Sequence, residues 1–148
     1  MDSVKHLARI DSLCSGDLAA EHGGPDVVLA GPGYCVVRLA TSHETRTGDR
    51  AYRAEAVQDL HALKEHFTLL LDDRWGRQQV PWGMGTLVVR VERGEVIPEP
   101  WASMTALVDE LNLWQPHDTD RWVALGVADR DPGDEIHLLA LVTETDPP

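Results

Sequence analysis

The sequence predicts a single α+β domain, in which a mostly antiparallel sheet is built from three hairpins and covered by helices in the order α-β-β-α-β-β-α-β-β. Apolar residues recur at helical spacing in three segments, and short apolar runs bounded by Gly and Pro lie between them. At 148 residues, with 43% hydrophobic and 26% charged residues, the chain has the size and composition of one globular domain. We therefore expect residues 1–148 to fold together, with an N-terminal helix and loop over 1–24 and a frayed tail over 144–148.

The most regular helical pattern covers residues 50–74, where an apolar stripe repeats every three or four residues until Gly76 ends it. A shorter amphipathic helix is expected over 2–14. A third helix is expected after Pro100, because proline suits the first turn of a helix. Its apolar stripe consists of Met104, Leu107, Val108, Leu111 and Trp114.

Three pairs of β-strands are expected, each pair joined by a short turn. The pairs are 27–30 with 34–40, 86–92 with 95–97, and 121–128 with 136–143. Gly31-Pro32-Gly33 provides the first turn and Arg93-Gly94 the second. The strands of the last pair are apolar on both faces, so this hairpin should lie at the centre of the sheet and be covered on each side.

The net charge of −12 is unevenly distributed along the chain. Residues 95–148 contain twelve acidic and two basic residues, a net charge of −10, whereas residues 1–94 contain thirteen acidic and eleven basic residues, a net charge of −2. So many carboxylates repel phosphate groups, and we therefore expect binding neither to nucleic acid nor to an anionic membrane.

The bias among the basic residues, eleven Arg against two Lys, is typical of GC-rich codons and predicts a bacterial source. The chain has neither a membrane-spanning apolar run nor a signal-peptide pattern, and we expect a cytoplasmic protein. Cys14 and Cys35 are accordingly expected to be reduced, buried thiols.

Two places in the sequence contain residue types that bind metals. The acidic segment 129–135 resembles part of a calcium loop, but its twelfth position falls on Ala140 in an apolar strand, so a solvated turn is favoured. His61 and Glu65 share a helix face without the further ligands that zinc needs. Glycine-rich phosphate loops and nucleophile-elbow motifs are also absent. We therefore predict neither a metal nor a cofactor.

All five tryptophans lie between positions 75 and 122. Trp82 and Trp101 occur in segments rich in Pro and Gly, where periodicity does not require burial. Tryptophan is enriched in protein interfaces, but a loop tryptophan also commonly closes the edge of a small core. The sequence leaves both roles open for these two residues.

These features favour a non-enzymatic bacterial binding module whose acidic C-terminal surface engages a basic protein. In size and charge the chain resembles the small acidic immunity proteins and secretion chaperones of bacteria. The candidate partner-binding residues are Trp82, Trp101, Asp109, Glu110, Asp118, Asp120, Asp129, Asp131, Asp134 and Glu135. One alternative is a small enzyme or small-ligand-binding protein, with a pocket lined by tryptophans and by His61, His117 or His137. A homo-oligomer, or a subunit of a larger assembly, is a further alternative.

Overall fold

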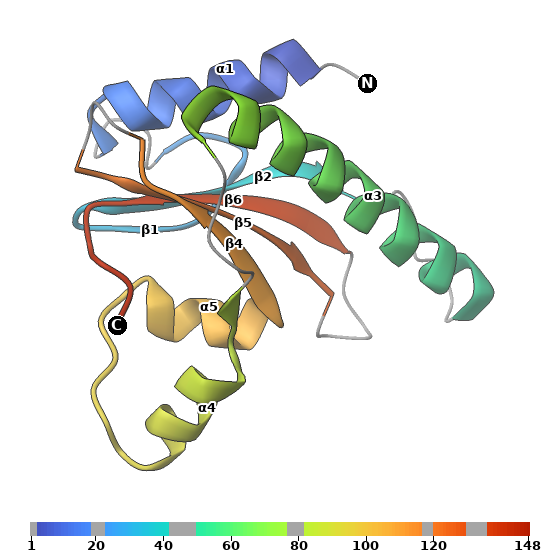
Figure 1. The fold of residues 1–148 in the computed structure, drawn as a ribbon. Coiled ribbons are helices and arrows are strands. Elements are labelled where there is room, and N and C mark those ends of the chain that lie inside the picture. The colour runs from blue at the N-terminus through green and yellow to red at the C-terminus, as the bar shows by residue number, and fades with distance from the viewer. Residues whose placement is uncertain (1–2, 19–22, 42–49, 77–81, 117–119, 130–135) are drawn as a thin grey trace.

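The computed structural model describes residues 3–18, 23–41, 50–76, 82–116, 120–129 and 136–148, with side chains except at 3 and 50–53. It shows an α+β domain in which a six-stranded antiparallel sheet carries helices on both faces (Figure 1). The described helices are α1 (Ser3–Ser15), α3 (Arg50–Trp75), α4 (Gly85–Glu92) and α5 (Trp101–Leu107). The strands are β1 (Val27–Gly31), β2 (Tyr34–Thr41), β3 (Trp82–Gly83), β4 (Glu110–Trp114), β5 (Trp122–Ala128) and β6 (His137–Thr143).

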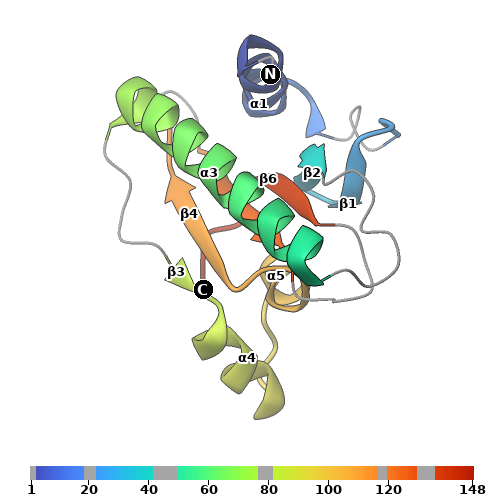
Figure 2. The ribbon, with the colours of Figure 1, turned by 90° about the vertical axis from the view of Figure 1, so that its right-hand side faces the viewer.

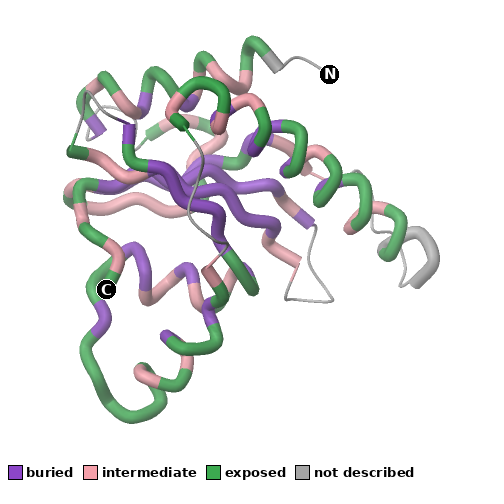
Figure 3. Tube along the Cα trace, in the orientation of Figure 1, coloured by how far each residue is buried: buried purple, intermediate pink, exposed green. Residues whose placement is uncertain are grey.

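The strand order in the sheet is β1-β2-β6-β5-β4-β3. The hairpin of β5 and β6 therefore lies at the centre, as the apolar character of both its faces predicts. In Figure 3 these two strands are buried along most of their length. The predicted first hairpin is also present, because β1 pairs with β2 around the turn at residues 32–33.

Helices α1 and α3 cover one face of the sheet, while α4 and α5 lie on the other (Figures 1 and 2). Each face has its own apolar core. We call the core beneath α1 and α3 the first core, which includes Phe67 and Leu138, and the core beside α4 and α5 the second core, which includes Trp101 and Leu139. Successive residues of a strand point to opposite faces, so β6 supplies both cores. In the part of the chain that the structure describes, no helix is long and apolar enough to cross a membrane.

The strand expected over residues 86–92 is wrong, because this segment forms helix α4. Its valines favour a strand, but they do not share a buried face. Leu87 is buried, whereas Val89 and Val91 are 44% and 43% exposed. A helix satisfies its backbone groups internally and needs no neighbouring strand. The expected hairpin with residues 95–97 is consequently absent from the described residues.

The end of the third predicted helix is also wrong. Helix α5 ends at Leu107, and Val108 has extended backbone angles of φ −130 and ψ 156. Residues Glu110–Trp114 then form strand β4, which pairs with β5. The segment fits both periodicities, since Leu111 and Trp114 are spaced for a helix while Glu110, Asn112 and Trp114 share one side of a strand.

The C-terminal residues 144–146, which were expected to fray, are held by hydrogen bonds. The indole Nε1 of Trp101 donates to the Thr145 carbonyl at 3.2 Å, and Nε1 of Trp122 donates to Asp146 Oδ1 at 3.0 Å. The backbone N–H of Glu144 donates to the Gly33 carbonyl at 2.8 Å. Two tryptophans and the β1–β2 turn therefore fasten this part of the tail to the sheet.

Arg121 connects the end of α1 to the start of β5. Its Nη1 donates to the carbonyls of Leu13, Cys14 and Gly16 at 2.6, 3.1 and 2.7 Å, and its Nε lies 3.4 Å from a carboxylate oxygen of Glu144. The last carbonyls of a helix have no partner within the helix and carry partial negative charge, which a guanidinium satisfies. Arg121 thus helps to hold the C-terminal end of α1 over the sheet.

Candidate functional site

Three of the predicted partner-binding carboxylates lie at one end of the sheet. Strand β4 pairs with β5 in a register that sets Asn112 opposite Leu125. Glu110 is the first residue of β4 and Asp109 precedes it, whereas Asp129 follows the last residue of β5. Because β4 and β5 are antiparallel, the start of β4 and the end of β5 lie at the same end of the sheet. We call Asp109, Glu110 and Asp129 the acidic end of the sheet.

The other predicted carboxylates are not part of this described cluster. Asp120 is exposed and precedes β5, at the opposite end of that strand from Asp129. Asp118, Asp131, Asp134 and Glu135 lie outside the described residues. His117, proposed for a ligand pocket, also lies outside them.

Two carboxylates of the acidic end contact basic side chains of α3. Glu110 lies 3.5 Å from the ammonium group of Lys64, whose side chain is only 6% exposed. Asp129 Oδ2 lies 3.5 Å from Nε2 of His61. The ammonium group of Lys64 therefore partly neutralises the acidic end.

The contact between Lys64 and Glu110 belongs to a regular row of polar contacts between α3 and β4, which we call the polar ladder. Its three rungs are Lys64–Glu110 at 3.5 Å, Thr68 Oγ1–Asn112 Nδ2 at 3.1 Å and Asp72 Oδ1–Trp114 Nε1 at 2.9 Å. Four helical residues rise about 6.0 Å and two strand residues about 6.6 Å, so the side chains of the two elements stay in step. The signal for this ladder is the spacing of Lys64, Thr68 and Asp72, but it can be used only once β4 is known to be a strand.

The two loop tryptophans pack against each other beside α5. Their ring centroids are 5.5 Å apart with an interplanar angle of 58°. Trp101 is fully buried in the second core, so its predicted place on a binding surface is wrong. Trp82 is partly buried against the same core and keeps some exposed surface.

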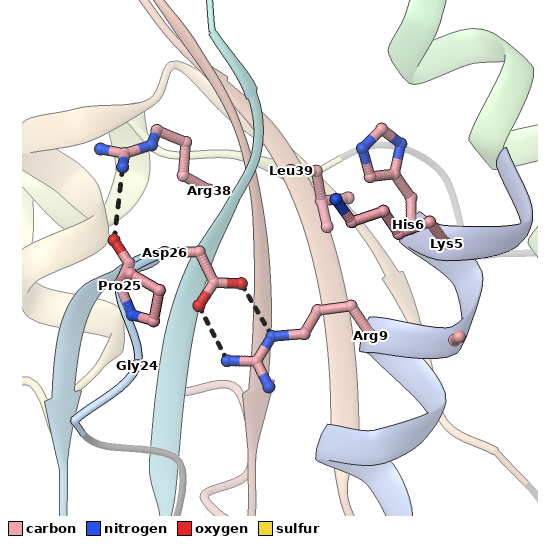
Figure 4. Close-up of a pocket in the computed structure, with 9 residues that line it drawn as sticks. Lys5, His6, Arg9, Gly24, Pro25, Asp26, Arg38 and Leu39 are labelled. Atoms are coloured by element: carbon pink, nitrogen blue, oxygen red, sulfur yellow. Dashed lines mark hydrogen bonds and ion pairs between the residues drawn. The ribbon is translucent and has the colours of Figure 1, made fainter. Parts of the chain in front are cut away.

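A cavity of about 620 Å³ lies on the other side of the sheet, between α1 and the segment that leads into β1. Its lining residues are Lys5, His6, Ala8, Arg9, Gly24, Pro25, Asp26, Arg38 and Leu39. Figure 4 shows Arg9 reaching from α1 to Asp26, where Nε and Nη2 donate to the two carboxylate oxygens at 2.8 and 2.9 Å. The lining contains a histidine but no tryptophan, and it does not include His61 or His137, so it differs from the expected pocket.

The described residues contain no group of three or more His, Cys, Asp or Glu side chains that could hold a metal ion. Most of the acidic segment 129–135 lies outside these residues. Both cysteines are free thiols, with Cys35 buried and Cys14 half-buried in the first core.

Comparisons with protein-family models, with curated proteins and with solved structures found no match to this chain.

Proposed function

We propose that the protein is a non-enzymatic binding module that engages a basic protein partner through the acidic end of the sheet. The observation that carries the proposal is the excess of carboxylates. Among the side chains that the structure describes, we count seventeen Asp and Glu against eight Lys and Arg. At least five of these eight basic groups contact a carboxylate of the same chain, among them Arg9, Lys64, Arg74, Arg90 and Arg121.

A surface rich in carboxylates attracts a basic partner and accelerates its association. Asp109 is an exposed member of the acidic end, and Asp129 is oriented by its contact with His61. Glu110 is half-exposed and held by Lys64, so it contributes charge from a fixed position. The preference for arginine over lysine supports a bacterial source, and we further propose that the protein is cytoplasmic.

The test compares two baits of equal charge. In Asp109→Lys/Asp129→Lys the acidic end is reversed, whereas Asp17→Lys/Asp73→Lys reverses two exposed carboxylates elsewhere on the chain. Each bait and the wild type are used for affinity capture from the native lysate at low salt. We expect a basic protein to be captured by the wild type and the control but lost from the acidic-end variant.

The captured protein is then purified, and its association kinetics are measured at increasing salt. The association rate should fall as salt screens charges beyond about 10 Å at 0.1 M. A partner that binds both variants equally, or an association rate that does not respond to salt, contradicts the proposal.

A further inference from the structure

We propose that the cavity between α1 and the start of β1 binds a small organic anion that carries a carboxylate or phosphate group. The proposal is independent of the protein-binding surface, which lies at the acidic end of the sheet. Three of the eight described Lys and Arg side chains line this cavity, together with a single carboxylate, that of Asp26. The lining therefore has a formal charge of 3 − 1 = +2, within a chain whose net charge is −12.

The two cationic groups of α1 lie on the same side of the cavity. Lys5 and Arg9 are four residues apart, and this spacing places both on one face of the helix. In Figure 4 both side chains extend from α1 toward the sheet, while Arg38 reaches to the Pro25 carbonyl at 3.5 Å, away from them. Lys5 and Arg9 are therefore the groups that would contact the anion directly.

The pairing with Asp26 orients the guanidinium of Arg9. The contact uses two of the five N–H donors that an arginine has, and it holds the plane of the group in one orientation. A guanidinium that is already oriented loses less conformational entropy when it binds an anion. Asp26 also repels an anion, so the same residue orients Arg9 and limits the affinity of the site.

The size of the cavity and its apolar wall define the class of ligand. A volume of about 620 Å³ suits a small molecule rather than a macromolecular segment. Leu39, Ala8 and Pro25 provide apolar surface beside the charged groups. The ring of His6 is held against Phe67, with centroids 5.4 Å apart. The ligand class is thus an anionic head attached to a small, less polar body.

The Arg9–Asp26 pair also fastens α1 to the segment before β1, and Asp26→Asn separates this structural role from ligand binding. The substitution is nearly isosteric: it keeps one oxygen that can accept from Arg9 and removes the negative charge that faces the cavity. A site for anions should bind them more tightly in this variant, even if the melting temperature falls. A purely structural ion pair would lower the melting temperature and leave anion affinity unchanged.

The experiment titrates the whole, ¹⁵N-labelled chain with inorganic phosphate and, separately, with citrate, at constant ionic strength. We expect saturable shifts of the backbone amides of residues 5–9, 24, 26 and 38–39 for at least one of the two anions. Lys5→Gln should weaken that binding about tenfold, the effect of losing one charge-assisted contact. The control Arg93→Gln, an exposed arginine at the end of α4, removes the same charge and should have no effect.

Binding of phosphate alone would assign a phosphate ester as the ligand, and binding of citrate alone would assign a carboxylate. The proposal is overturned if neither anion shifts these amides at millimolar concentration. It is equally overturned if Lys5→Gln and Arg93→Gln weaken binding to the same extent, because the attraction would then be a property of the whole charged surface.

Discussion

The two faces of the sheet are covered in different ways. On the first face the 26-residue helix α3 crosses β4, β5 and β6, and the polar ladder places charged and amide groups inside the interface. On the second face the helices have eight and seven residues, and large apolar side chains such as Trp101 and Met104 fill the space. Figure 2 shows α4 projecting from that side, where it contributes Leu87 to the core.

This difference indicates when a small domain can place polar groups between its layers. A long helix keeps a constant rise along a strand, so each buried polar group can meet a partner at a repeated distance. Short helices that follow turns have no such repeat, and apolar side chains are more tolerant of irregular contacts because the hydrophobic effect is not directional. Glu110 is the outermost residue of the ladder on β4. Its carboxylate contacts Lys64 of α3, and its side chain remains half-exposed to solvent.

The largest expected effect comes from adjacent leucines of β6 that supply the two cores. Leu138 is 0% exposed in the first core and Leu139 is 1% exposed in the second. Leu138→Ala and Leu139→Ala should each lower the free energy of unfolding by about 2–5 kcal/mol. Urea unfolding, followed by tryptophan fluorescence and by circular dichroism, should give one coincident transition for both variants.

The control is Leu69→Ala on α3, where the leucine is 69% exposed and the change should stay within about 0.5 kcal/mol. Two separate transitions, or a loss below about 1 kcal/mol for Leu138→Ala, would show that the faces do not fold together as one domain.

An intermediate effect is expected at the first rung of the polar ladder. Glu110→Gln leaves the 6% exposed ammonium of Lys64 without its carboxylate, and water that reaches the half-exposed position 110 limits the loss to about 1 kcal/mol. Lys64→Met removes the buried charge itself and should be close to neutral, because a methionine fills the same space. Thermal or urea unfolding of the two single variants and the double variant measures the coupling.

The double variant should be no less stable than Glu110→Gln alone. If Lys64→Met is the more destabilising of the two single changes, Lys64 is held mainly by contacts other than Glu110, and the role assigned to the first rung is wrong.

The smallest effect concerns Tyr34, which contributes to the second core. Burial raises the pKa of its phenol above the ordinary value of 10.0, and the nearby Glu99 carboxylate adds to this shift. Below pH 10.0 the phenol keeps its proton in both folded and unfolded states. Above that pH the unfolded state loses the proton first, so stability should fall with rising pH until the folded Tyr34 also ionises.

Tyr34→Phe should therefore reduce the loss of stability above pH 10.0. The pH dependence of stability near neutral pH should be the same in the variant and the wild type. Melting temperatures of the wild type and the variant across this range measure the difference. Parallel declines in the two proteins would contradict the assignment.

The sequence by itself determined the elements with strong, unambiguous periodicity. These are helices α1 and α3, the β1–β2 hairpin and the central β5–β6 hairpin, and each agrees with its expected range to within a few residues. The long stripe of α3 fits only helical spacing, and the short apolar runs of the two hairpins are bounded by Gly and Pro turns, which favour strands. Asp129 follows a predicted strand, whereas Asp109 and Glu110 fall inside the predicted third helix, so the sequence showed that these residues are acidic but not that they share one end of the sheet.

Only the tertiary structure decided the rest. The segments 86–92 and 110–114 have compositions that fit a helix or a strand, and the choice depended on which neighbours were available to bury them. The partners of Glu110 and Asp129 lie on α3, and the cationic cavity forms where Arg9 meets Asp26, seventeen residues away along the chain. Such contacts join residues far apart in sequence, and their geometry exists only after the helices have packed on the sheet.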